Sequence, residues 1–262
     1  MSYRDPGPAV TLPGRGDPAR RNPVRLLLSA APWKAAAFLG GYVLISGFLA
    51  AIALTGAAVG AVFAITLAGM PVLIAASGAI RFAAGAERVR LHPVLAAPLL
   101  GGYRQPAAPG VFGQARTRWQ DPATWRDLAY LIGLWVPLAA LDFAVLLVWI
   151  VLAGLVVVPA WYRFPEQDLA HGATAHGVQL GYFPNGPHGP GGHGFYITTL
   201  PQAFLAAACA LIVFLLFNYV LVATARAHAG VARNLLRPPA DPLAAAKTVL
   251  AGPSPLGPLQ PH

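Results

Sequence analysis

The sequence predicts an all-α integral membrane protein with four transmembrane helices, arranged as two tandem hairpins with both termini in the cytoplasm. Only 10% of the 262 residues are charged and 56% are hydrophobic, whereas a soluble domain is nearer to about 25% charged. Residues 35–80 and 128–162 together contain a single charge, Asp142. Of the 18 Lys and Arg residues, only Arg163 lies between the third and fourth apolar runs. The positive-inside bias therefore places the other basic segments on the cytoplasmic side.

The first half of the chain divides into an arm, a hairpin and a linker. Residues 1–32 are rich in Pro, Gly and Arg and are expected to form a disordered cytoplasmic arm. Residues 33–93 form the first transmembrane hairpin, because the uncharged run 35–80 is too long for one span of about 20 residues. Its turn is expected near residues 55–60, where Gly is frequent. Residues 94–120 are basic and are expected to be a cytoplasmic linker.

The second transmembrane hairpin is predicted over residues 121–237. Asp121 can accept hydrogen bonds from free amides of a first helical turn, and Pro122 fits the first helical position. A kink or break is expected at Pro137. The hairpin includes an outer His/Gly-rich loop at 163–200, and a disordered tail follows at 238–262.

An internal repeat supports the two-hairpin prediction. Each hairpin ends in the pattern R-x3-G-x2-R-x2-L-x-P. The first copy is Arg81, Gly85, Arg88, Leu91 and Pro93, and the second is Arg226, Gly230, Arg233, Leu236 and Pro238. In both copies the two arginines lie seven residues apart, on one face of a helix that continues out of the span.

The chain resembles a known family at its most specific motifs. The opening D-P-A-T-W-R-D-L-A-Y-L, the T-L-P-Q-A start of span four and the exit A-R-A-H-A-G-V-A-R-N-L-L-R-P are similar to the "putative sensor" transmembrane domain of actinobacterial proteins. That domain commonly precedes a histidine kinase. The resemblance implies a four-helix input domain in the cell membrane that belongs to a two-component system. Kinase activity is not carried over, because only 24 residues follow Pro238 and none forms a phosphoacceptor or ATP-binding motif.

Asp142 is the first candidate site residue, since a carboxylate within a membrane span is costly to bury and is a functional candidate by default. It lies about 28 Å along the helix from Trp161, at nearly the same estimated depth as Asn218. Asn218 and Tyr219 are therefore the expected hydrogen-bond partners of Asp142. A structural role and a switch or ion-path role both remain open for this residue.

The outer loop holds the second candidate site. HGATAHG and HGPGGHG repeat one pattern, with His171, His176, His188 and His193. Four imidazoles can complete a tetrahedral Zn or Cu site, and their charge state changes near neutral pH. The spacing matches no rigid metal motif, so a solvated loop without a cofactor is the main expectation and metal or pH sensing the alternative.

These patterns favour a non-enzymatic sensory or signal-coupling protein. No carboxylate pair, nucleophile motif, Cys cluster or phosphate-binding Gly loop is present. The expected partners are the lipid bilayer, a histidine kinase or other cytoplasmic signalling protein, and a second copy of the chain; a nucleic acid is not expected. Arg226, Gly230 and Arg233 are the expected output segment, with a basic membrane flank as the alternative. A small transporter or channel subunit and a ligand-free membrane scaffold are the other functions considered.

Overall fold

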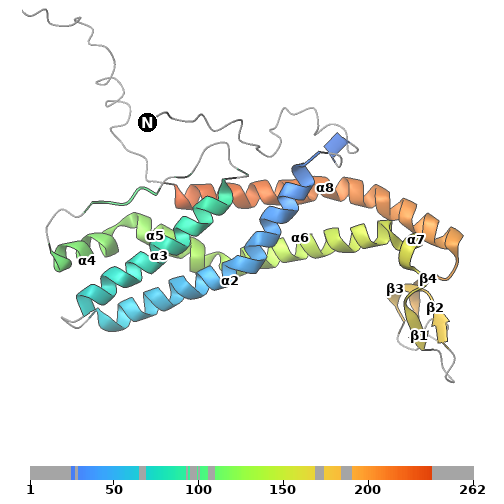
Figure 1. Ribbon diagram of the computed structural model, residues 1–262, viewed down its shortest axis with the longest axis horizontal. Helices are drawn as coiled ribbons and strands as arrows, with labels where there is room; N and C mark the ends of the chain where they lie inside the picture. The colour runs from blue at the N-terminus through green and yellow to red at the C-terminus, as the bar shows by residue number, and fades with distance from the viewer. Residues whose placement is uncertain are drawn as a thin grey trace, which may run out of the picture. The chain divides into compact units, whose positions relative to one another are not determined.

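The computed structural model describes residues 25–26, 29–64, 69–92, 94, 99, 101–105, 110–168, 174–183 and 191–237. Its long helices are α2 (Ala31–Phe63), α3 (Gly69–Leu91), α6 (Trp135–Val156) and α8 (Leu200–Leu236) (Figure 1). All four are long and apolar enough to cross a membrane. The predicted arm at 1–32 lies mostly outside the described residues, and the predicted tail at 238–262 lies entirely outside them.

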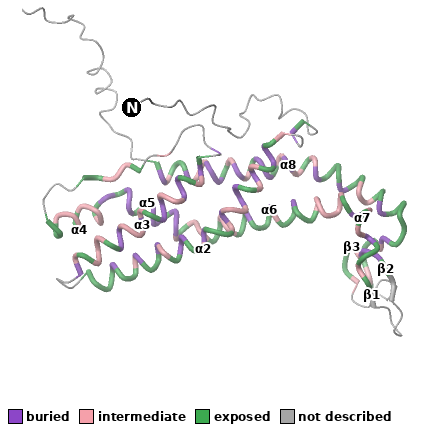
Figure 2. The backbone as a smooth tube through the Cα atoms, viewed as in Figure 1, coloured by how far each residue is buried: buried purple, intermediate pink, exposed green. Residues whose placement is uncertain are grey.

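The four long helices expose apolar rather than polar surface. Leu44 in α2 is 83% exposed, Val136 in α6 is 61% exposed and Leu205 in α8 is 68% exposed. Buried positions form narrow stripes, which Figure 2 shows as purple segments alternating with green along each helix. In α6 the buried residues are Asp142, Val145 and Trp149, spaced three and four apart on one helical face. This pattern fits helices that pack through one stripe and face lipid with the rest.

The predicted turn at residues 55–60 was wrong. Helix α2 continues to Phe63, and α3 begins at Gly69. The glycines of this region are packing positions: a Cβ on Gly56 would lie 3.1 Å from the Ala76 carbonyl oxygen, and one on Gly60 would lie 2.7 Å from the Trp119 ring. Glycine therefore marks close approach of neighbouring elements here, while the helix keeps its backbone hydrogen bonds, as lipid requires.

Short helical segments precede and follow α6. Before it lie α4 (Val111–Gln120), α5 (Pro122–Leu128) and the π-helical turn η2 (Ala129–Gly133), and after it lies the short α7 (Val158–Trp161). Asp121 caps α5 by accepting a hydrogen bond from the Ala123 amide at 3.0 Å, and Pro122 follows it, as predicted. The helix restarts at Trp135, so the break precedes Pro137, which lies in the first turn of α6 where proline is tolerated.

Helix α4 lies inside the segment predicted as a linker. Its Trp119 donates from Nε1 to the Leu73 carbonyl oxygen at 3.0 Å, and Arg118 donates to that of Ile74 at 3.2 Å. Both acceptors lie near the beginning of α3, about 20 Å along the helix from Arg88. The linker thus ends in a helix that packs alongside α3 rather than only at one end of it.

The described part of the His/Gly-rich loop at 163–200 contains two antiparallel hairpins. Strand β1 (Glu166–Asp168) pairs with β2 (Thr174–His176), and β3 (Val178–Tyr182) pairs with β4 (His193–Ile197). Gly181 and Gly194 lie opposite each other with φ of 143° and 151°, and a Cβ on either would lie 2.2 Å from a carbonyl oxygen of the other strand.

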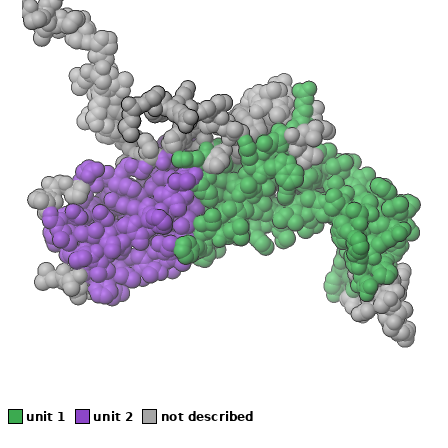
Figure 3. Space-filling model, in the orientation of Figure 1, with its two compact units in different colours: residues 1–48, 90–97, 134–231 green, residues 49–89, 98–133, 232–262 purple. Residues whose placement is uncertain are grey.

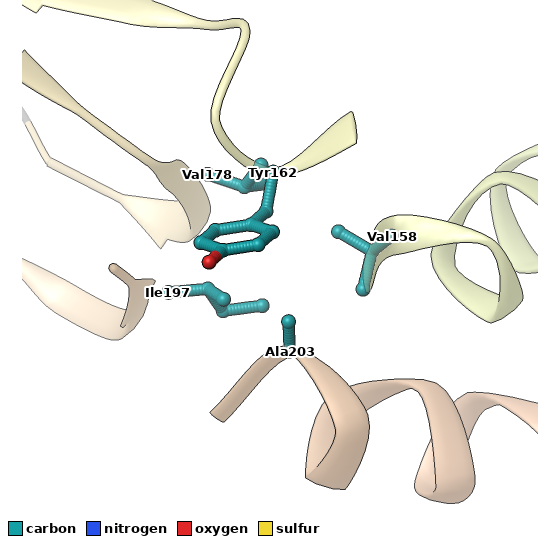
Figure 4. Packing of buried hydrophobic residues seen from close by; sticks show 5 residues of the cluster. All are labelled: Val158, Tyr162, Val178, Ile197 and Ala203. Atoms are coloured by element: carbon teal, nitrogen blue, oxygen red, sulfur yellow. The ribbon is translucent and has the colours of Figure 1, made fainter. Parts of the chain in front are cut away.

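A small hydrophobic core anchors β3 and β4 to the helices. It consists of Val158, Tyr162, Val178, Ile197 and Ala203, whose side chains converge around the Tyr162 ring (Figure 4). The Tyr162 side chain is only 4% exposed. It is therefore a core residue beneath β3 and β4, although aromatic residues at the ends of membrane spans are commonly found at the membrane–water interface.

The chain divides into two compact units, shown in different colours in Figure 3. Unit 1 comprises residues 1–48, 90–97 and 134–231, and unit 2 comprises residues 49–89, 98–133 and 232–262. Within the described residues, each unit contains a buried cluster of polar side chains that includes or contacts a residue of α8.

Candidate functional site

The polar cluster of unit 1 is a buried pair formed by Asp142 of α6 and His228 of α8. The His228 Nδ1 and Asp142 Oδ2 atoms are 2.7 Å apart, and both side chains are fully buried. Asp142 Oδ1 has no hydrogen-bond partner within the described part of the chain. When Asp142 is ionised, Nδ1 must carry the proton and donate, because a carboxylate only accepts. The pair is thus a polar tie between two helices that otherwise pack through apolar side chains.

Aromatic side chains of α2 enclose the imidazole. Tyr42 meets the His228 ring edge-on, with centroids 4.4 Å apart, and Phe38 does so at 5.3 Å. Arg90 stacks over the Phe38 ring at 4.3 Å and donates to the Phe38 carbonyl oxygen at 2.8 Å. Three helices and the end of α3 therefore meet at one ionisable pair, which makes the pair sensitive to any displacement among them.

Asn218, the partner predicted for Asp142, binds elsewhere. Its Oδ1 accepts from Trp149 Nε1 at 3.1 Å, and its amide donates to the Phe214 carbonyl oxygen at 2.6 Å. The depth estimate assumed that spans three and four advance equally from the outer loop. In the structure Asn218 reaches only the level of Trp149, and α8 needs almost three further turns to bring His228 to Asp142. Tyr219 is half-buried.

Unit 2 holds a second buried cluster, which we call the polar clamp: Arg81, Arg88, Tyr103, Asp121 and Asp127. Arg88 donates to Asp127 Oδ1 at 2.7 Å and to the Tyr103 hydroxyl at 2.8 Å, and that hydroxyl donates to Asp127 Oδ2 at 2.6 Å. Arg81 pairs with Asp121 at 3.3 Å and stacks on Tyr103 at 4.1 Å. The two arginines of the first exit motif thus meet the two carboxylates of the D-P-A-T-W-R-D-L motif.

Burial dominates the electrostatics of the clamp. It raises the pKa of the Asp127 carboxyl above its ordinary value, although the hydrogen bond from Tyr103 and the charge of Arg88 act in the opposite direction. Burial also raises the pKa of Tyr103 to about 12, reinforced by its hydrogen bond to Asp127. Tyr103 therefore stays protonated at physiological pH, and its hydroxyl bridges the two groups by accepting from Arg88 and donating to Asp127.

The clamp also binds the end of α8. Arg88 donates from Nε to the Leu236 carbonyl oxygen at 3.1 Å, and Arg126 donates to that of Asn234 at 2.6 Å. The last carbonyl groups of a helix have no partner within the helix, so these side chains satisfy acceptors that would otherwise need water.

The two copies of the exit repeat differ in environment. Leu91 and Leu236 are both buried, at 0% and 1% exposed, and the added Cβ of an alanine at Gly85 or Gly230 would have open space around it. Arg88, however, is buried in the clamp, whereas its counterpart Arg233 is exposed. The two copies thus share a buried leucine and an open glycine position, but the second arginine is bound to Asp127 in the first copy and is exposed in the second.

The structure separates the two described histidines of the His/Gly-rich loop. His176 pairs with Glu166 across β1 and β2, while His193 pairs with Tyr182 across β3 and β4, and both are exposed. His171 and His188 lie outside the described residues. Within the described ranges no group of three or more potential metal ligands occurs. Metal or pH sensing by the loop stays a prediction.

The fold and these clusters define a class of protein. It is a membrane protein with four long apolar helices, in which buried polar side chains bind the last helix, α8. A family model described as "Putative sensor" matches residues 26–236. The chain therefore belongs to this sensor family, and that membership points to a sensor role. No curated protein matches the chain, and no solved structure matches it.

Proposed function

We propose that the protein is a non-enzymatic membrane sensor that passes a signal to a cytoplasmic partner through the end of α8. The observation that carries this proposal is a pair of hydrogen bonds to the last carbonyl groups of α8, one from Arg88 of the polar clamp and one from Arg126 of α5. Helix α8 is continuous from Leu200 to Leu236 and also carries His228. A rotation or shift of this helix would change both polar ties.

The few, directional hydrogen bonds to the end of α8 allow this helix end to have two states, one bound by the arginines and one released from them. Hydrogen bonds weaken steeply once geometry is lost, so a small displacement of α8 exchanges the arginine donors for water. The exposed Arg233 lies near this helix end, so its position relative to a partner would differ between the bound and the released state. A histidine kinase or another cytoplasmic signalling protein is the partner that fits this output, as the family resemblance implies.

This function requires the outer hairpins and the end of α8 to lie on opposite sides of the cell membrane. Cysteine labelling with a membrane-impermeant maleimide checks that arrangement in intact cells, after the native Cys209 has been replaced by Ala. Tyr182→Cys is expected to react from outside, whereas Arg237→Cys is expected to react only after lysis. Labelling of Arg237→Cys in intact cells would contradict the proposed topology and the output role of α8 together.

Partner contact is tested with a photo-crosslinking amino acid at Arg237 in the native host. We expect one dominant crosslinked signalling protein, and Arg233→Gln is expected to reduce its yield several-fold by removing the exposed charge. Gly230→Ala stabilises the helical output segment by about 1 kcal/mol and should also change the yield.

Gly85→Ala is the matched control, because it makes the same change in the other copy of the repeat, where space is equally open. Crosslinks to lipid alone, or equal yields from all variants, would leave α8 as a membrane anchor.

A further inference from the structure

A cavity of about 530 Å³ lies within unit 2 and is lined almost wholly by apolar atoms. Its walls come from α2, α3, α4 and α5. This volume lies in the range of small-molecule sites, about 300–1,000 Å³, and such sites are mostly apolar with few polar groups. The buried clusters described above do not contribute to its lining, so the cavity is a separate feature of the fold.

The indole of Trp119 gives this cavity a fixed wall. Trp119 donates from Nε1 to the Leu73 carbonyl oxygen at 3.0 Å, and its own carbonyl oxygen accepts from Trp125 Nε1 at 2.8 Å. Gly60 lets the Trp119 ring lie directly against α2, since any Cβ there would be 2.7 Å from the ring. The cavity is therefore a built space between anchored aromatic rings and a surface of small residues.

One cation lines the cavity. Arg116 is exposed and, within the described part of the chain, forms no hydrogen bond or ion pair. Arg118, two residues later, instead uses its guanidinium on the Ile74 carbonyl oxygen. An apolar space with a single uncommitted cation is complementary to a ligand that has an apolar chain and one anionic group.

We propose that this cavity binds the chain of a single-chain anionic amphiphile, a long-chain carboxylate, whose head group pairs with Arg116. The apolar walls exclude a polar metabolite, because its buried groups would lack partners. A neutral hydrocarbon would leave Arg116 unused. Only the idea that the bound carboxylate acts as a signal rests on the proposed sensor function. Binding of the carboxylate itself needs no cytoplasmic partner.

The test uses the purified full-length protein in a neutral detergent and a photoreactive stearate with a mid-chain diazirine. Mass spectrometry is expected to map saturable crosslinks to Met70, Phe112 or Trp119, and unlabelled stearate should compete for them. Stearate methyl ester and the variant Arg116→Gln should each bind about tenfold more weakly, the effect of losing one charge-assisted hydrogen bond.

Two adjacent substitutions localise the binding. Ala57→Phe places a ring in the cavity and should abolish the saturable crosslinks, whereas Ala58→Phe makes the same change at an exposed neighbour outside the lining and should preserve them. The methyl ester comparison uses the unmodified protein, so it stays decisive if Ala57→Phe does not fold.

Crosslinks that rise linearly with probe, or equal affinity for acid and ester, would overturn the proposal. These readouts contain no partner, so a negative result leaves signal transfer through α8 to be judged by the Arg237 crosslinks alone.

Discussion

His228→Leu is expected to lower the free energy of unfolding by about 3 kcal/mol, at the lower end for leaving a buried carboxylate without its partner. The substitution keeps a similar volume but leaves the fully buried Asp142 carboxylate without its only described partner. Asp142→Leu removes the carboxylate and should cost less, because a neutral imidazole remains. The double variant Asp142→Leu/His228→Leu should recover most of the loss, since apolar replacement of a buried pair is often neutral.

Unfolding of the purified protein in detergent, followed by circular dichroism, measures these differences. Asn218→Leu serves as the control: it removes a neutral hydrogen bond with Trp149 on the same two helices, and such bonds in membrane proteins average about 0.6 kcal/mol. If His228→Leu lowered the free energy of unfolding no more than Asn218→Leu does, the Asp142–His228 pair would contribute no more than a neutral hydrogen bond. If the double variant were as unstable as the single one, packing rather than charge would be the cause.

The sequence predicted the four long helices because the hydropathy of many consecutive residues adds up to a clear indication of a span. Many apolar residues in a row indicate a span whatever their individual contacts, and α8 begins at Leu200 as expected. The cap at Asp121 was also predictable, because capping depends on neighbours in sequence. Local chemistry therefore gave the element types and several of their boundaries.

Contacts between helices were harder to predict, because they depend on how far each helix advances. Asp142 was recognised as a candidate, but its partner is His228 and not Asn218, since α8 and α6 do not advance equally along one another. The glycines at 56 and 60 were assigned to a turn because sequence alone does not distinguish a turn glycine from a packing glycine. A usable signal did exist for the clamp: Arg81 and Arg88 match Asp121 and Asp127 in charge and nearly in spacing.

Arg88→Met is expected to release the end of α8. Arg88 donates hydrogen bonds to Asp127, Tyr103 and the Leu236 carbonyl oxygen, and it is 6% exposed. Its loss leaves Asp127 buried with Tyr103 as its remaining close donor, and breaking such a pair costs about 3–5 kcal/mol. The raised pKa of Asp127 moderates this cost, since the carboxyl can take up a proton instead of staying charged.

The release can be separated from general loss of stability by measuring mobility at the helix end. A nitroxide attached at Arg237→Cys, with Cys209 replaced by Ala, reports motion one residue beyond α8. Arg88→Met should sharpen its spectrum, and Arg126→Gln should do so to a smaller degree because only the bond to Asn234 is lost. Arg104→Met is the matched control, since its side chain is exposed and only its backbone amide donates to Asp121.

A second nitroxide, at an exposed position in the middle of α8 such as Leu216, should be unchanged in all three variants. Sharpening at both positions would indicate unfolding of the whole helix, and sharpening at neither would show that the end of α8 is held by packing. The clamp has its proposed role only if mobility rises at the helix end alone, because only then do Arg88 and Arg126 control the element that a partner would contact.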